Sequence, residues 1–120
     1  MPKTILIADD DRMLTKVLKK FLEDQDFNVL VADDGDDALK VMDMTPPDLV
    51  VLDIQMPRMN GYSFLFEMHK RDWAARTPVI VLTCREELED IFRVEGVKEY
   101  LIKPIRSEDL LEKIKKHICR

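Results

Sequence analysis

The stretch Thr4-Ile-Leu-Ile-Ala8, followed directly by Asp9-Asp10-Asp11, decides the fold, because an unbroken apolar run ends in a group of acids. Four more short apolar runs occur along the chain, at residues 28–32, 49–52, 79–82 and 99–102. Most are rich in Val, Ile and Leu and show little alternation, which is typical of strands covered on both faces. The sequence therefore predicts five buried β-strands.

Longer segments with apolar residues at helical spacing separate these runs. They predict helices at residues 12–24, 36–44, 62–72, 87–95 and 108–118. Pro46-Pro47 stops the second helix, Gly96 suits the end of the fourth, and Ser107 suits the start of the fifth. The alternation predicts an α/β fold: a doubly wound, five-stranded parallel sheet with five helices on its two faces.

Length and composition bound the class of protein. With 120 residues we expect one domain over residues 1–120, and 46% hydrophobic residues exclude intrinsic disorder. The net charge of −5, without a basic run, argues against direct binding of nucleic acid. No apolar stretch is long enough to span a membrane and no signal peptide is recognisable, so Cys84 and Cys119 are expected to be reduced thiols in the cytoplasm.

Polar residues follow the apolar runs where a parallel sheet places its ligands, at the carboxyl ends of the strands. Asp9 and Asp10 follow the first strand, Asp53 the third, Thr83 the fourth and Lys103 the fifth. Three converging carboxylates repel one another, so they require positive charge nearby. Lys103 supplies one charge, and a Mg²⁺ ion, which prefers oxygen ligands, would supply two more.

A carboxylate beside Mg²⁺, an ammonium and a hydroxyl is suited to accept a phosphoryl group. Asp53 would be the nucleophile, Lys103 and the metal would neutralise charge, and Thr83 would donate a hydrogen bond. Acids that precede a helix are also common N-caps, and this alternative applies to Asp9, Asp10 and Asp11 taken singly. The whole set favours phosphoryl transfer.

The motif Asp53-Ile-Gln-Met-Pro-Arg-Met-Asn-Gly61, with the pair Asp9-Asp10, Thr83 and Tyr100-Leu-Ile-Lys-Pro104, resembles the receiver domain of two-component response regulators over the whole chain. The resemblance implies a flavodoxin-like sheet of order 2-1-3-4-5. It implies that Asp53 is the phosphoacceptor and that Mg²⁺ is held by Asp9 (mainly through water), Asp10, Asp53 and the backbone carbonyl of Gln55.

The resemblance also implies a switch. Lys103 would pair with the phosphoryl group, Thr83 would move towards it, and Tyr100 would change rotamer to follow. The Lys103–Pro104 bond would be cis. The donor would be a sensor histidine kinase or a phosphotransfer protein, and a downstream effector protein or domain would bind the switch face, with the chain a monomer or a phosphorylation-dependent dimer.

The sequence departs from the family pattern after Thr83. Lys103 follows Thr83 by 20 positions, a couple fewer than is usual, and the residues between lack the family's small side chains. A shortened fourth-helix region is therefore expected to alter the output face. Arg85 lies two positions after Thr83, as Gln55 does after Asp53, and we hypothesise that Arg85 covers the site and slows hydrolysis of the aspartyl-phosphate.

Other side chains have simpler interpretations. Cys84 is expected to be a small buried hydrophobe, and Trp73 to pack against the body of the domain. His69 and His117 are expected at the surface rather than at a metal. The basic run from Lys113 to His117 is either a solvated helix face or a partner contact.

Three functions remain open. The first is a phosphorylation-dependent signalling switch that assists its own phosphorylation and dephosphorylation but is not an enzyme for an external substrate. The second is an interaction module that keeps the fold without the switch. The third is a small Mg²⁺-dependent phosphatase, suggested by Asp9-Asp10-Asp11 but lacking the chain needed to cap a substrate.

Overall fold

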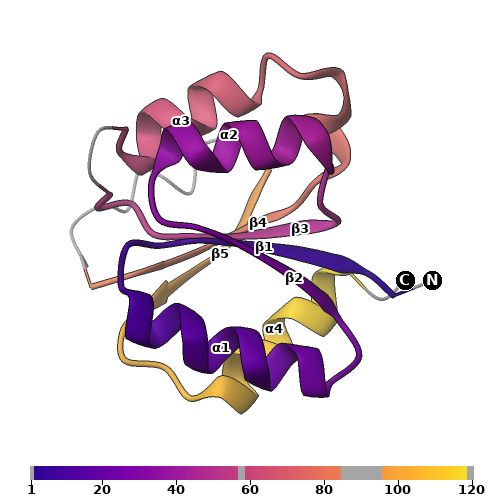
Figure 1. Ribbon diagram of the computed structural model, residues 1–120, viewed down its shortest axis with the longest axis vertical. Coiled ribbons are helices and arrows are strands. Elements are labelled where there is room, and N and C mark those ends of the chain that lie inside the picture. Colours follow the sequence, from indigo (N-terminus) through magenta and orange to yellow (C-terminus); the bar gives the residue numbers. More distant parts are fainter. Residues whose placement is uncertain (1, 57–58, 85–95, 119–120) are drawn as a thin grey trace.

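The computed structural model describes residues 2–56, 59–84 and 96–118. Five parallel strands form one sheet in the order β2-β1-β3-β4-β5 (Figure 1). The fold class and the strand order are those expected. The strands are β1 (Thr4–Ala8), β2 (Asn28–Ala32), β3 (Leu49–Leu52), β4 (Val79–Thr83) and β5 (Val97–Ile102).

Helices cover both faces of the sheet (Figure 1). Helices α1 (Arg12–Asp24) and α4 (Ser107–Ile118) lie on one face, and α2 (Gly35–Met44) and α3 (Gly61–Met68) on the other. Successive residues of β1 enter different hydrophobic clusters: Ile5 packs with Leu18 of α1, and Leu6 packs with Met42 of α2. Burial on both faces explains why the strands show no polar alternation.

The number and length of the helices differ from expectation. The described residues contain four α-helices and a short 3₁₀ helix, η1 (Asp72–Arg76), whereas the helix predicted at residues 87–95 lies outside the described residues. The helix predicted at 62–72 ends at Met68 instead. The amide N–H groups of Lys70 and Arg71 bond three residues back, to Glu67 and Met68, and these tighter bonds end the α-helix.

Strand β5 begins at Val97, two residues before the predicted start. Val97 pairs with Val79, and the register then shifts before Ile80 pairs with Glu99. Because β5 is an edge strand, it carries the polar residues Lys98 and Glu99 near its start. The apolar pattern therefore did not reveal the first residues of this strand. Within the part of the chain that is described, no helix is both long and apolar enough to cross a membrane.

Candidate functional site

Backbone hydrogen bonds extend three strands by one residue and so fix the polar residues at the edge of the sheet. The amide N–H of Asp9 donates to Ala32 O at 3.0 Å, and that of Asp53 donates to Ala8 O at 2.9 Å. The amide N–H of Lys103 donates to Thr83 O at 2.8 Å. Asp9, Asp53 and Lys103 are therefore held by rigid elements rather than by free loops.

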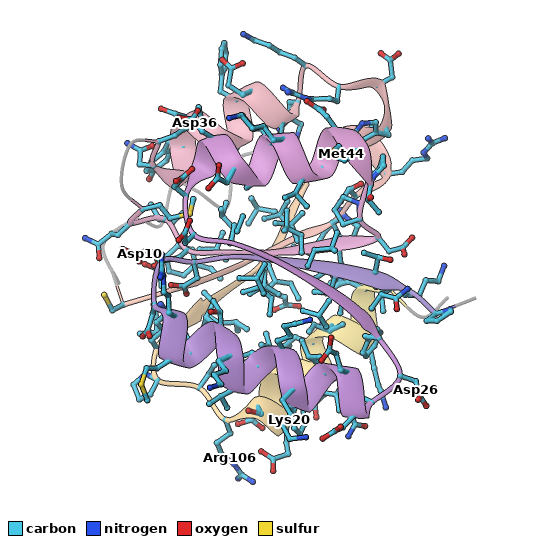
Figure 2. The ribbon with its side chains drawn as sticks, in the orientation of Figure 1. Asp10, Lys20, Asp26, Asp36, Met44 and Arg106 are labelled. Atoms are coloured by element: carbon cyan, nitrogen blue, oxygen red, sulfur yellow. The ribbon has the colours of Figure 1, made fainter. Side chains whose placement is uncertain are left out.

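Three carboxylates converge at this edge. Oxygen atoms of Asp9, Asp10 and Asp53 lie within 4.8 Å of one another. Asp9 and Asp53 are buried, at 3% and 6% exposure, whereas Asp10 is exposed at the end of the sheet (Figure 2). Buried carboxylates at this separation repel one another, so the site favours the approach of a cation.

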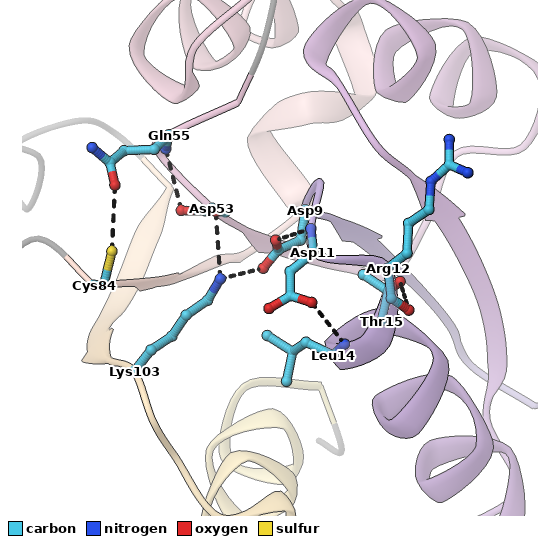
Figure 3. A network of polar contacts seen from close by, with 9 residues as sticks. All are labelled: Asp9, Asp11, Arg12, Leu14, Thr15, Asp53, Gln55, Cys84 and Lys103. Atoms are coloured by element: carbon cyan, nitrogen blue, oxygen red, sulfur yellow. Dashed lines mark hydrogen bonds and ion pairs between the residues drawn. The ribbon is translucent and has the colours of Figure 1, made fainter.

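Lys103 provides positive charge in this cluster. Its Nζ lies 2.7 Å from Asp9 Oδ2 and 3.4 Å from Asp53 Oδ2 (Figure 3). Burial lowers the pKa of Lys103, but its hydrogen bond to Asp9 and the charges of Asp9 and Asp53 outweigh burial, so the pKa is raised. Burial, aided by repulsion from Asp53, raises the pKa of Asp9 despite the hydrogen bonds from Lys103 and the Asp11 N–H.

The N-cap interpretation is confirmed for Asp11. Its side chain accepts from the Leu14 N–H at 3.1 Å at the start of α1 (Figure 3). Asp9 instead accepts from the Asp11 N–H at 2.9 Å while it contacts Lys103. Asp11 thus caps the start of α1, whereas Asp9 belongs to the charged cluster.

Gln55 and Cys84 lie beside Asp53. The Gln55 N–H donates to Asp53 Oδ1 at 3.2 Å, and Cys84 Sγ donates to Gln55 Oε1 at 3.3 Å (Figure 3). The prediction that Cys84 is buried is wrong: it is exposed, because it lies just past the last residue of β4. Arg85, to which we assigned a covering role, lies outside the described residues.

The expected switch residues come from β4 and β5. Thr83 is fully buried, and its Oγ1 has no hydrogen-bond partner among the described residues. Tyr100 lies opposite Val81 in the register and packs, partly buried, against the hydrophobic cluster on the α2 and α3 side. The Lys103–Pro104 peptide bond is cis, the isomer that the resemblance implied.

The donor set fits a magnesium ion. Among the described residues, three carboxylates face one ammonium group, that of Lys103, and hard oxygen donors are what Mg²⁺ prefers. A second acidic group, formed by Asp33, Asp34 and Asp37, is engaged in the fold: Asp33 pairs with Arg12, and Asp34 caps α2 through the Asp37 N–H. The first group is therefore the better candidate for a metal.

Two histidines have partners that were not foreseen. His117 is largely buried and its Nε2 lies 2.7 Å from Glu99 Oε2, and His69 Nδ1 lies 2.7 Å from Leu65 O. Helical spacing places His69 one turn after Leu65, so that contact could have been found. No local signal links His117 on α4 to Glu99 on β5. The basic run after Lys113 also partly pairs within the fold, since Lys113 and Lys116 lie 3.9 and 3.6 Å from Glu99.

Comparison with known sequences identifies the fold family. The family model of the response regulator receiver domain matches residues 5–115. The transcriptional regulatory protein CpxR of Klebsiella pneumoniae is 43% identical over 113 residues, covering 92% of this chain and 47% of that protein. The response regulator MprA of Mycolicibacterium vanbaalenii is 35% identical over 119 residues, covering 96% of this chain and 50% of that protein. The chain thus spans about half the length of these curated relatives.

Solved structures agree. A response regulator receiver domain protein (CheY-like) from Methanospirillum hungatei has a TM-score of 0.90 at 30% identity, covering 99% of this chain and 95% of that one. The BeF3-activated N-terminal receiver domain of RstA from Klebsiella pneumoniae has a TM-score of 0.84 at 27% identity, covering 98% of this chain and 99% of that one.

Proposed function

The chain belongs to the family of response regulator receiver domains, and we propose that it is a phosphorylation-dependent switch of a two-component system with Asp53 as the phosphoacceptor. The observation that carries the proposal is the position of Lys103 Nζ, 2.7 Å from Asp9 and 3.4 Å from Asp53. A cation between two carboxylates is placed to pair with a phosphoryl group attached to Asp53, since the group would bring anionic oxygens within its reach.

The transfer needs no separate base. Aspartate carboxylates act as nucleophiles in their own right, so an Asp53 oxygen would attack phosphorus directly. A new O–P bond forms as the bond between phosphorus and the donor breaks, and the bonding electrons leave with the donor. The donor would be a histidine side chain of a sensor kinase or phosphotransfer protein. Lys103 would hold a phosphoryl oxygen during this step.

A magnesium ion held by Asp9, Asp10, Asp53 and the carbonyl of Gln55 would neutralise charge on the phosphoryl oxygens when bound. Asp9 would act mainly through water. The contact of Asp9 with Lys103 supports this, because that carboxylate is already partly compensated. The Gln55 N–H bond to Asp53 Oδ1 holds the backbone of Gln55 close to the Asp53 carboxylate.

Thr83 and Tyr100 would carry the signal away from Asp53. The buried hydroxyl of Thr83, which no described residue pairs with, could donate to a phosphoryl oxygen, and this supports a movement towards Asp53. Tyr100 lies on the neighbouring strand and would fill the space that this movement opens. The equilibrium of the partner-binding face would then shift towards an active state. The BeF3-activated form of the RstA relative supports a distinct active state here.

The partner of the active state would be an effector protein or a further domain. Relatives named as transcriptional regulators favour an effector that acts on transcription, with nucleic acid bound by that effector rather than by these residues. The chain would act as a monomer or as a phosphorylation-dependent dimer. We expect the cytoplasm as its location and no turnover of an external metabolite.

Intact-protein mass spectrometry after incubation with Mg²⁺ and acetyl phosphate tests the proposal. The expected result is a gain of one phosphoryl group that disappears in Asp53→Asn and after chelation of Mg²⁺. Asp33→Asn is the matched control, because it removes an acid from the neighbouring cluster and should leave uptake unchanged.

Uptake that persists in Asp53→Asn would overturn the assignment of the phosphoacceptor. No uptake under any condition would instead favour the interaction module without a switch. Hydrolysis of a phosphomonoester by Asp53→Asn would favour the phosphatase.

A further inference from the structure

A second pocket lies at the edge of the sheet opposite to Asp53. Its volume is about 540 Å³, and its walls include Thr77 and Pro78, which precede β4, and Gly96, which precedes β5. The residues of the phosphorylation site follow the carboxyl ends of the same parallel strands. The pocket is therefore separate from that site, and the proposed function makes no use of it.

The lining of this pocket is basic. His69, Arg76, Lys98 and His117 come from four parts of the chain and converge on it, and none of its described lining residues is acidic. Arg76 and Lys98 supply a guanidinium and an ammonium group to this lining. The whole chain has a net charge of −5, so the basic lining of this pocket has the opposite sign to the charge of the chain.

Glu99 lies on β5 next to Lys98, and its carboxylate is already paired with basic side chains. His117 Nε2 lies 2.7 Å from its carboxylate, with Lys116 Nζ at 3.6 Å and Lys113 Nζ at 3.9 Å. One negative charge thus faces three basic side chains. Arg76 and Lys98 have no acidic partner among the described residues, so their charges remain available to a ligand.

His69 offers a defined atom to the pocket. Its Nδ1 lies 2.7 Å from Leu65 O, and a carbonyl oxygen only accepts, so Nδ1 carries the hydrogen. The other ring nitrogen, Nε2, faces Gly96, where an added Cβ would lie 3.4 Å from it. The absence of a side chain at Gly96 keeps this nitrogen accessible.

The remaining wall is partly apolar, since Ala74, Ala75 and Pro78 contribute to it. The volume lies within the range of small-molecule sites, roughly 300–1,000 Å³. We propose that this pocket binds a small organic phosphate, with the dianionic group held by Arg76 and Lys98 and the apolar body against Ala75 and Pro78. A phosphate suits this pair of residues because its several oxygens can accept hydrogen bonds from the Arg76 guanidinium and the Lys98 ammonium at once, whereas Nε2 of a neutral His69 ring would accept from another part of the ligand.

Titration of the whole chain with phenyl phosphate, followed by ¹H–¹⁵N NMR in a magnesium-free buffer, tests the proposal. We expect saturable chemical-shift changes in the amide signals of Gly96 and Lys98. Inorganic phosphate, which has only the anionic group, and phenol, which has only the ring, should each bind more weakly than phenyl phosphate. Lys98→Gln and Arg76→Gln should each weaken binding about tenfold. The matched control, Lys40→Gln, changes a lysine that lines a different pocket and should bind as the unmodified chain does.

Asp53→Asn should retain binding at this pocket, so the result does not depend on whether Asp53 is phosphorylated. The spectra report directly whether each variant remains folded, and both substituted residues are exposed. The proposal is overturned by shifts confined to Asp53 and Lys103, by equal binding of inorganic phosphate, or by unchanged affinity in folded Lys98→Gln and Arg76→Gln.

Discussion

The Thr83 hydroxyl makes no hydrogen bond that would stabilise the described part of the fold. The residue is fully buried, and among the described residues its Oγ1 has no hydrogen-bond partner. An unsatisfied buried polar group costs about 1–3 kcal/mol. Replacing the hydroxyl by a methyl group in Thr83→Val keeps the shape, so we expect the free energy of unfolding to rise by about 1 kcal/mol in urea denaturation.

Thr77→Val is the matched control for this prediction. Thr77 is also buried, but its Oγ1 lies 3.4 Å from Pro47 O and 3.5 Å from Trp73 O. Its hydroxyl is therefore partnered, and its loss should lower the free energy of unfolding by about 0.5–1 kcal/mol. Equal destabilisation by both substitutions would show that Thr83 also has a partner in the folded state. If only Thr83→Val raises the free energy of unfolding, the Thr83 hydroxyl destabilises the folded state.

At the scale of a helix, Asp11 has a structural role that its neighbours do not share. It caps α1 by accepting from the Leu14 N–H at 3.1 Å. Asp11→Ala should lower the free energy of unfolding by about 1 kcal/mol, measured by urea denaturation, while phosphoryl uptake from acetyl phosphate continues. Asp11→Ser supplies another capping oxygen and should restore most of the stability. Loss of uptake in Asp11→Ser would place Asp11 in the site instead.

Strand β5 and helix α4 are joined by a pair that depends on pH. The hydrogen bond from His117 lowers the pKa of Glu99, and Lys113 and Lys116 add to this effect although burial opposes it. A carboxyl whose folded pKa lies below its ordinary value of 4.5 stabilises the fold above that value, and the contribution is lost as pH falls through the folded pKa.

Glu99→Gln should therefore reduce the free energy of unfolding by about 1 kcal/mol or less near about pH 6, and the difference should shrink as the pH falls below 4.5 and through the lowered pKa of Glu99. Thermal unfolding across that range measures it. Glu112→Gln changes an exposed glutamate on α4, the helix that carries His117, and should have little effect at either pH. A difference that persists at the acid end would mean that Glu99 stabilises β5 without its charge.

At the scale of the whole molecule, the sequence predicted the features that depend on local patterns of residues along the chain. Burial on both faces makes the strands apolar, and parallel strands end at one edge, so Asp9, Asp53 and Lys103 were expected at that edge. The order of the strands came from the family resemblance, and the length of the Lys103 side chain lets it reach past β4 to the two carboxylates. The features missed depend on contacts between distant segments. Glu99 meets His117 through tertiary packing, and the turn after Met68 is braced by Arg71, which pairs with Asp43 on α2.

We expect the acidic cluster to link the stability of the whole fold to magnesium. Oxygens of Asp9, Asp10 and Asp53 lie within 4.8 Å of one another, so a bound divalent cation would relieve their repulsion only in the folded chain. A ligand that binds the folded state alone at tenfold its Kd stabilises by about 1.4 kcal/mol. For a chain of 120 residues that corresponds to a rise in Tm of about 5–6 °C, which scanning calorimetry with and without chelator would detect.

Two variants separate specific binding from a general effect of salt. Asp53→Asn removes a proposed ligand and should abolish most of the rise, whereas Asp33→Asn removes a carboxylate from the other acidic group and should preserve it. Sodium chloride at matched ionic strength should give a smaller rise, because screening acts weakly on buried groups. An equal rise in Tm in Asp53→Asn would show that the cation binds elsewhere. Asp53 would then have to accept the phosphoryl group without a metal bound to its own carboxylate.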